Sequence, residues 1–477
     1  MLTRLFSKRL LLPCLFILPC TYAYLTATFH LIVISSIWGL IECLFYLYFV
    51  QTKQRLQSIT KPERLLTKTE RAALFRQCIN TIKDFRAWCE GWFYYRTDYT
   101  HPSIHQIRRQ NIAQWLAWAF WHDHLEHVQK EKAWAEELEW MIREAEDRFS
   151  YQFSDGLNPD VECIRLNLDP VNAVHRPLLA YVGIYLITQC FNLVGLQWCW
   201  GFTPSHSTTH SWGGPIQLLD HLYQSLFNLA SHQPKDKITY WYRAPTDGQS
   251  KTPIVFVHGI GVGVLSYAEW ISLLLSRLSD RPIFLVELPY VAMRMVDTVP
   301  TATETTKEVR QMLHQYGYDK AVYVSHSLGT AVTSWIIKLA PDTVAGTVMI
   351  DPICFLLHYH HVAFNFVHRL PRQLIEYLMY YGASREMYIS HYISRHFQWF
   401  ESICFVEHIQ KTTLNNMAVF LSEKDRIVGS EDVYHYLLEH GINTYVMKGL
   451  EHAMFLINRK WKNTIIHQIE TISSKTD

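Results

Sequence analysis

The second half of the chain predicts a doubly wound α/β domain built on a mostly parallel sheet. From about residue 237 to residue 477, short apolar runs rich in β-branched residues alternate with stretches of helical length. Near-continuous apolar runs are typical of strands buried on both faces, and their alternation with helices is typical of parallel sheets. Glycine-rich or polar turns follow several runs, at the strand ends where this class of fold places its chemistry.

The individual elements follow from the same alternation. Strands are expected at 238–243, 253–258, 282–288, 321–325, 346–350, 417–421 and 443–447. Helices are expected between them, among others at 267–278, 303–315 and 328–339. Right-handed crossovers then bring the carboxyl ends of the parallel strands to one edge of the sheet.

Residues 1–51 are expected to anchor the protein in a membrane. Between Leu10 and Val50 the only formally charged residue is Glu42, and this run of about 41 residues is long enough for two spans of about 20. Basic residues flank the run on both sides. A helical hairpin keeps both basic clusters on the cytoplasmic side, so it is favoured over a single span.

Two further features bear on that anchor. A hairpin could turn at Pro19, at Thr21 or within 26–30. The alternative is a signal peptide cleaved near Ala23 or Ala27, which the unbroken continuation of the apolar run disfavours.

Residues 52–236 form an expected helical accessory region. Within it, residues 177–202 carry no formal charge but contain several polar residues that lie on one helical stripe. We expect this stretch to lie at the membrane interface or to pack on the following domain, rather than to cross the bilayer. Trp198 and Trp200 suit an interfacial position.

Overall composition excludes several classes of protein. The 44 basic and 43 acidic side chains leave a net charge of +1, so the chain has no global basic field and nucleic acid is not an expected partner. Its 49% hydrophobic content argues against intrinsic disorder. The 10 cysteines are scattered without metal-type spacing, and no metal is expected. The histidines at 122–127 and 358–361 are interpreted as ordinary polar residues.

Ser327 is the candidate nucleophile. It stands at the centre of Ser325-His326-Ser327-Leu328-Gly329, directly after the expected strand 321–325 and before a helix. A serine on a sharp strand-to-helix turn projects its hydroxyl group out of the sheet, and the turn requires small residues two positions away on each side. Ser325 replaces the glycine that usually opens this motif, but it is small enough to preserve the turn.

A glycine-rich loop after the strand 253–258 supplies a candidate oxyanion site. The sequence His258-Gly259-Ile260-Gly261-Val262-Gly263 allows close approach of the backbone to a substrate. We expect one backbone N–H donor from Ile260 or Gly261, and a second from Leu328, the residue after the nucleophile.

Asp425 and His452 complete the candidate triad. Asp425 follows the strand 417–421 and His452 follows the strand 443–447, so the order along the chain is serine, aspartate, histidine. His452 would accept the proton of Ser327, and Asp425 would orient the imidazole ring and stabilise its charge. Asp351, at the end of the preceding strand, is the alternative acid.

These motifs together resemble the α/β-hydrolase superfamily, of esterase and lipase type, over about residues 237–470. The resemblance rests on HGIGVG at 258–263, SHSLG at 325–329, SEKDRIV at 422–428 and LEHAMF at 450–455. It implies a serine nucleophile with neither a metal nor an organic cofactor. The general impression is of a membrane-attached fungal member.

The resemblance also places a cap at residues 353–413, an insertion dense in aromatic side chains. Apolar cap residues line pockets for apolar acyl or alkyl groups. We therefore expect a membrane-attached serine hydrolase acting on a hydrophobic, lipid-like ester, on an intracellular membrane with the domain of 237–477 facing the cytosol. The alternative is a catalytically silent module that acts as a membrane-bound interaction protein. The sequence indicates no particular protein partner.

Overall fold

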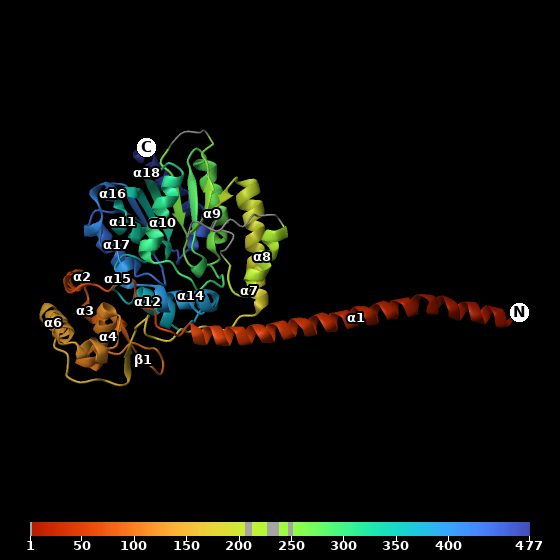
Figure 1. The fold of residues 1–477 in the computed structure, drawn as a ribbon, viewed down its shortest axis with the longest axis horizontal. Coiled ribbons are helices and arrows are strands. Elements are labelled where there is room, and N and C mark those ends of the chain that lie inside the picture. Colours follow the sequence, from red (N-terminus) through yellow and green to blue (C-terminus); the bar gives the residue numbers. More distant parts are fainter. Residues whose placement is uncertain (1, 206–211, 227–237, 247–250) are drawn as a thin grey trace. The chain divides into compact units, whose positions relative to one another are not determined.

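The computed structural model describes residues 2–205, 212–226, 238–246 and 251–477. The chain divides into two compact units (Figure 1). Unit 1 comprises residues 1–56 and 175–180, and unit 2 comprises residues 57–174 and 181–477.

Unit 1 consists mainly of helix α1 (Leu2–Arg55), which is unbroken. The structure therefore has one continuous helix where a hairpin was expected. Residues 21–38 contain neither glycine nor proline, and the hydroxyl groups of Thr26 and Thr28 donate hydrogen bonds to the helix's own carbonyl groups at Tyr22 and Tyr24. Nothing in this segment favours a turn over helical continuation. Its portion Thr21–Arg55 is long and apolar enough to cross a membrane.

Within unit 1, the carboxylate of Glu42 accepts hydrogen bonds from the start of a second apolar helix. That helix is α7 (Leu178–Cys190), continued by the π-helical segment η2 (Phe191–Cys199). The carboxylate of Glu42 accepts hydrogen bonds from the backbone N–H groups of Leu178, at 2.8 Å, and Leu179, at 3.1 Å. An acidic group at a helix N-terminus is favourable because the first N–H groups there lack partners in the helix.

Unit 2 is built on a sheet whose described strands number eight. They are β3 (Thr203–Pro204), β4 (Thr239–Arg243), β5 (Ile254–Val257), β6 (Ile283–Glu287), β7 (Ala321–His326), β8 (Val344–Ile350), β9 (Met417–Ser422) and β10 (Asn443–Met447). Their order across the sheet is β10-β9-β8-β7-β5-β6-β4-β3. The strands from β10 to β6 pair in parallel, whereas β4 and β3 are antiparallel. All seven expected strands are present, and the short edge strand β3 was not anticipated.

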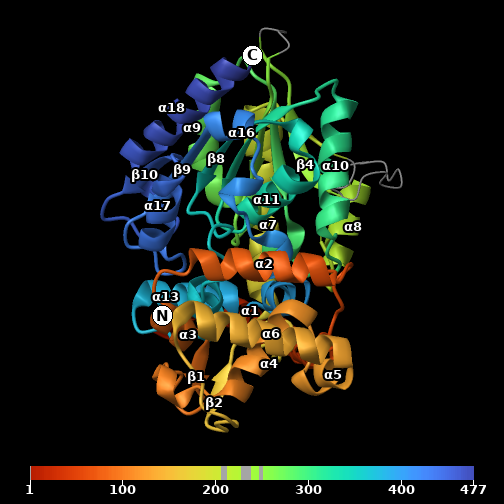
Figure 2. The same cartoon turned by 90° about the vertical axis from the view of Figure 1, so that its left-hand side faces the viewer.

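Both faces of the sheet are covered by helices, as the near-continuous apolar strands require (Figure 2). On β5, Val255 and Val257 point to one face, where they join α10 (Ala302–Gln315), α11 (Gly329–Leu339) and α17 (Ser430–Glu439) in a common core. Ile254 and Phe256 point to the other face and pack with α9 (Ala268–Arg277) and α18 (Arg459–Thr476). The fold class expected from the sequence, a doubly wound and mostly parallel α/β sheet, is confirmed.

The strand order contains a switch point that positions the functional site. The chain passes from β5 outward to β6 and then crosses back to β7 on the other side of β5. The loops after β5 and β7 therefore diverge at the carboxyl ends of the strands, and ligands of open α/β sheets bind in such crevices.

A helical cap lies in the long connection between β8 and β9. Its helical segments are α12 (His361–Ala363), η7 (Phe364–His368), α13 (Leu374–Met379), η8 (Tyr380–Ser384), α14 (Met387–His391), η9 (Tyr392–His396), α15 (Trp399–Ser402), η10 (Val406–His408) and α16 (Lys411–Asn415). Three of these segments, η7, η8 and η9, are π-helical continuations of the α-helices before them, so the cap is made of short pieces rather than long helices.

The helical region before the sheet packs on this cap within unit 2. It contains α2 (Lys68–Thr81), α3 (Phe85–Gly91), α4 (Arg109–Trp121), α5 (Leu125–Lys130), α6 (Lys132–Phe149) and the two-stranded sheet β1 (Phe93–Tyr95)–β2 (Val161–Cys163). The indole N–H groups of Trp88 and Trp92 both donate to the carbonyl oxygen of His358, and that of Trp399 donates to Ala119. These indole groups therefore join the helical region to the cap by hydrogen bonds.

Candidate active site

Ser327 occupies a strained turn between β7 and α11. Its φ angle of +52° lies in the left-handed region, which is uncommon for a residue with a side chain. The turn is held from both sides: the Ser327 N–H donates to the carbonyl of Ile350, and its carbonyl accepts from the backbone and hydroxyl groups of Thr330. This is the sharp strand-to-helix turn expected from the sequence.

Close packing explains the glycine that follows the turn and the one that faces it. A Cβ atom on Gly329 would lie 2.4 Å from the carbonyl oxygen of Val257, and one on Gly259 would lie 2.9 Å from the Cβ of Ser327. Ser325, where a glycine is usual, is fully buried on β7. The substitution is therefore accommodated within the sheet and leaves the turn intact.

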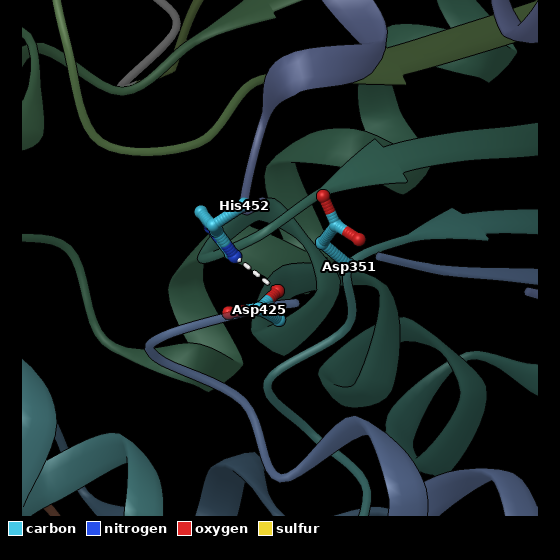
Figure 3. Close-up of side chains that lie close together, drawn as sticks. All are labelled: Asp351, Asp425 and His452. Atoms are coloured by element: carbon cyan, nitrogen blue, oxygen red, sulfur yellow. Dashed lines mark hydrogen bonds and ion pairs between the residues drawn. The ribbon is translucent and has the colours of Figure 1, made fainter. Parts of the chain in front are cut away.

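The structure brings Ser327, His452 and Asp425 into one hydrogen-bonded chain. Nε2 of His452 lies 2.8 Å from Oγ of Ser327, and Nδ1 lies 2.6 Å from Oδ2 of Asp425. Figure 3 shows the imidazole ring directed at Asp425, whose other oxygen accepts the N–H groups of Ile427 and Val428. This is the arrangement needed for a serine hydroxyl to lose its proton to an oriented imidazole.

The charge environment of His452 favours its protonated form. Burial alone would lower the pKa of His452, but the carboxylates of Asp425 and then Asp351 outweigh it and raise the pKa to about 9. An imidazolium ion that forms during proton transfer is therefore stabilised in place.

Asp351, the alternative acid, is close to His452 but makes no hydrogen bond to it (Figure 3). Its carboxylate accepts from the N–H of Ser422 at 2.8 Å, the hydroxyl of Ser422 at 3.1 Å and the N–H of Ala453 at 3.0 Å. Burial opposes its charge, yet His326, His452 and the Ala453 N–H together lower the pKa of Asp351. The geometry therefore favours Asp425 as the partner of His452.

Only part of the expected oxyanion site is available. The N–H of Gly261 donates to the carbonyl of Val291 at 3.1 Å, so the expectation that Gly261 could serve as a donor is wrong. Among the described residues, no acceptor lies within hydrogen-bond distance of the N–H groups of Ile260 and Leu328. Both residues line the cavity next to Ser327, as a pair of oxyanion donors should.

The side chains of Asp351, Asp425 and His452 are spaced as in a metal site, but they already make hydrogen bonds. Potential ligand atoms of Asp351, Asp425 and His452 lie within 4.8 Å of one another. Both ring nitrogens of His452 are engaged, one by Ser327 and one by Asp425. The arrangement fits proton transfer better than metal ligation.

The histidine clusters of the sequence do not form a further group of this kind within the described ranges. His127 pairs with Asp123, and His122 ends α4 and reaches the carbonyl of Thr60. His358 instead contacts Thr81 and His361 contacts Asp432, so neighbours in sequence point to different elements.

A buried polar chain beside the triad was not expected from the sequence. The hydroxyl of Tyr267 accepts the N–H of Gly259 at 3.0 Å and lies 2.6 Å from Nδ1 of His326. Nε2 of His326 lies 3.8 Å from Oδ2 of Asp351. Burial lowers the pKa of His326, which favours a neutral ring that can accept a hydrogen bond from the tyrosine hydroxyl. The chain links the glycine-rich loop to Asp351, and only the position of His326 inside the serine motif pointed to it.

An apolar cavity of about 290 Å³ opens onto Ser327. Its apolar lining residues are Leu166, Ile260, Leu328, Ile353, Val362, Ala363, Phe366, Val367, Met379, Ala383, Ile393, Phe397, Ile427, Ala453 and Met454. Most come from the cap, but Leu166 comes from the helical region before the sheet. Arg426 and Glu451 also border the cavity, and Arg426 bonds to Glu376 on the cap helix α13. The sequence indicated neither Leu166 nor this ionic contact as part of the site.

The strand order, the turn at Ser327 and the nearby histidine and aspartate define the fold as that of the α/β-hydrolases. No protein-family model and no curated protein matches the chain. Among solved structures, it is similar to a carboxylesterase of the thaumarchaeon Nitrososphaera gargenis, at 16% identity and a TM-score of 0.38 over 51% of this chain and 98% of that one.

Two Bacillus subtilis proteins give similar values. Naproxen esterase (carboxylesterase NP) matches at 13% identity and a TM-score of 0.35, over 52% of this chain and 96% of its own. Carboxylesterase CesB matches at 13% identity and a TM-score of 0.32, over 49% and 87%. The expected likeness to membrane-attached fungal members stays a prediction.

Proposed function

We propose that the protein is a membrane-attached serine hydrolase that cleaves a hydrophobic, lipid-like carboxylic ester through an acyl-enzyme. One observation carries the proposal: the hydroxyl of Ser327 lies 2.8 Å from His452, which is held by Asp425, at the mouth of an apolar cavity. A hydroxyl, an oriented base and adjacent unpaired N–H groups are the components of acyl transfer.

The reaction divides between these residues as follows. Oγ of Ser327 attacks the ester carbonyl carbon while Nε2 of His452 takes the hydroxyl proton. The carbonyl oxygen becomes an oxyanion that accepts from the N–H groups of Ile260 and Leu328. The C–O bond then breaks and His452 protonates the leaving alcohol. His452 then takes a proton from water, whose oxygen attacks the acyl carbon. The bond to Oγ of Ser327 breaks, His452 returns the proton to Oγ, and the acid is released.

The cavity argues for the substrate class. Its walls are almost entirely aliphatic and aromatic, and no charged group other than Arg426, Glu451 and the catalytic residues borders it in the described chain. An apolar acyl or alkyl chain gains from burial there, whereas a charged substrate would lose its hydration without a compensating partner.

Helix α1 supports the membrane attachment. Thr21–Arg55 has the length and composition of a span, and its window is only 6% buried. The described cysteines are all free, which suits a reducing compartment, so we propose an intracellular membrane with unit 2 in the cytosol. A carboxyl-terminal epitope tag tests this: in sealed microsomes it should be digested by added protease, and protection of the tag would contradict the proposed topology.

Hydrolysis of p-nitrophenyl esters with acyl chains of two to twelve carbons tests the activity. We expect kcat/KM to rise with chain length and the Ser327→Ala protein to lose activity by about 10⁶-fold. Ser325→Ala is the matched control, because the Ser325 hydroxyl is buried without a hydrogen-bond partner among the described residues. If the folded wild-type protein hydrolyses none of these esters, the silent interaction module is the better account.

A further inference from the structure

The outer side of helix α7 and its continuation η2 is apolar and uncovered. Leu186, Ile187, Val194 and Trp198 are exposed along one stripe, Leu186 by 59% and Trp198 by 72%. The opposite side of the same helix carries buried residues, among them Tyr185 and Thr188. The helix is thus apolar on the side where a soluble protein would place its polar residues.

Helix α8 (Ile216–Leu226) extends this surface. Leu218, Leu219 and Leu222 are exposed, Leu218 by 70%, whereas its charged residue Asp220 is buried. The carboxylate of Asp220 accepts hydrogen bonds from the hydroxyl of Tyr185 and the amide of Gln189, both at 3.4 Å. The two helices are therefore joined through their polar residues, and their leucines remain outside.

The ends of the first helix show that it does not cross a bilayer. At its start, Tyr181 donates to the carboxylate of Glu386 at 2.6 Å, and after its end Thr203 pairs with Tyr242 in the sheet. Both attachments lie in unit 2. A helix of 22 residues is about 33 Å long, so a crossing would carry its ends to opposite sides of the membrane. Of the positions considered from the sequence, the membrane interface and packing on the following domain are compatible with these attachments.

The composition of the surface identifies its occupant. From Pro177 to Leu219 the chain contains no formally charged residue, whereas protein–protein interfaces usually have a polar and charged rim. An exposed apolar patch of this kind marks an interaction site, and an exposed tryptophan suits the boundary between headgroups and acyl chains. The chain also carries α1, which is long and apolar enough to span a membrane. If α1 spans a bilayer, that bilayer is available to the outer face of α7 and α8.

We propose that the outer face of α7, η2 and α8 is a monotopic membrane-contact surface. It lies in the plane of the bilayer and immerses its leucines in the headgroup–acyl boundary, in addition to the attachment provided by α1. This surface is independent of the hydrolase activity, because none of its residues belongs to the site around Ser327.

Nitroxide labels in the full-length protein, reconstituted in phosphatidylcholine vesicles, test the proposal. The variants Leu186→Cys and Trp198→Cys are made in a background in which Cys14, Cys20, Cys43, Cys190 and Cys199 are replaced by serine. The five remaining cysteines are buried, so the introduced thiol is the accessible site for the label. Power saturation with oxygen and with a water-soluble nickel chelate reports the depth of each label. The control is Leu438→Cys, an exposed leucine of α17 far along the chain from this surface.

We expect the labels at 186 and 198 to lie at nearly equal depth, roughly 5–10 Å below the phosphates, and the label at 438 to be aqueous. A crossing helix would instead separate the first two by about 18 Å in depth. Aqueous labels at both positions would overturn the proposal, as would close label-to-label distances between two protein copies, which indicate a dimer. Adding Leu218→Glu and Leu222→Glu should move both labels outward while α1 keeps the protein on the vesicles.

Discussion

The connections that follow β8 and β9 each carry an aspartate near His452, but they differ in length and in how they use the carboxylate. The connection after β8 runs from Asp351 through the whole cap to Asn416, whereas the one after β9 reaches α17 at Ser430 within a few residues. Both oxygens of Asp351 accept from Ser422 and Ala453, while Asp425 keeps one oxygen for His452.

The hydrogen bonds of the two aspartates explain why only one of them is free to pair with His452. Asp425 satisfies the N–H groups of its own turn with Oδ1, at Ile427 and Val428, so Oδ2 remains directed at the imidazole. Asp351 holds neighbouring loops together and contributes charge at a distance. In the proposed function, the short connection supplies the catalytic acid, and the long one supplies most of the cavity lining.

The largest expected effect distinguishes the two acids directly. Asp425→Asn should lower kcat by about 10⁴-fold, because an amide no longer holds the tautomer of His452 or stabilises its charge. Ester hydrolysis is measured at the plateau of the pH profile, where Asp351→Asn should retain most of the activity. An equal or greater loss in Asp351→Asn would reverse the assignment.

The second prediction concerns how the cap selects the length of the acyl chain. Met379, on α13, lines the cavity, and Met379→Trp should shorten it. We expect kcat/KM for a dodecanoyl ester to fall about 10- to 100-fold while that for an acetyl ester is unchanged. Tyr377→Trp is the matched control, because Tyr377 is exposed on the same helix. Equal losses for both esters would show that the cap does not select chain length.

The pH dependence of activity tests the role of Asp351 as a remote charge. The base must be neutral to accept a proton, so kcat/KM should rise with pH through the pKa of His452 at about 9. In Asp351→Asn one negative charge is lost, the pKa falls by about 1–2 units, and the rise moves to lower pH. Activity at pH 7 relative to the plateau then increases about 10- to 50-fold. An unmoved profile would leave Asp351 with a structural role alone.

The smallest expected effect concerns the buried polar contacts that run from Gly259 through Tyr267 and His326 toward Asp351. Tyr267→Phe removes the hydroxyl between Gly259 and His326, which leaves a buried N–H unpaired and should cost about 1–3 kcal/mol of unfolding free energy. Urea unfolding measures this loss. Tyr290→Phe is the control, since the buried hydroxyl of Tyr290 has no partner within the described structure. Equal stability of the two variants would refute a supporting role for this chain.

The fold and the principal side chains of the site could be predicted because they depend on local patterns. Apolar runs fix the strands, small residues around Ser327 fix its turn, and parallel strands bring Asp425 and His452 to the same edge of the sheet. Contacts between distant segments could not be predicted in this way. The N–H of Gly261 is taken by Val291, Leu166 reaches the cavity from the accessory region, and Tyr267 meets His326 only in the folded protein.

The two long apolar segments also show that contacts between distant parts of the chain are hard to predict from sequence. Charge counting favoured a hairpin in the first 51 residues, but the structure continues as one helix through Pro19 and the other positions where a turn was considered. The sequence left the orientation of 177–202 open because it does not reveal where the ends of that helix attach. The bonds of Tyr181 and Thr203 supply this information.

The most direct test of the account is the site of covalent labelling by a fluorophosphonate. The reagent reacts with a serine whose proton an adjacent base removes, so the full-length protein should gain one adduct, which peptide mass mapping places on Ser327. Ser327→Ala should not be labelled, and Asp425→Asn should be labelled far more slowly. A folded wild-type protein that takes no label, or that takes it at Ser325 or elsewhere, would contradict the assignment of Ser327 as the nucleophile.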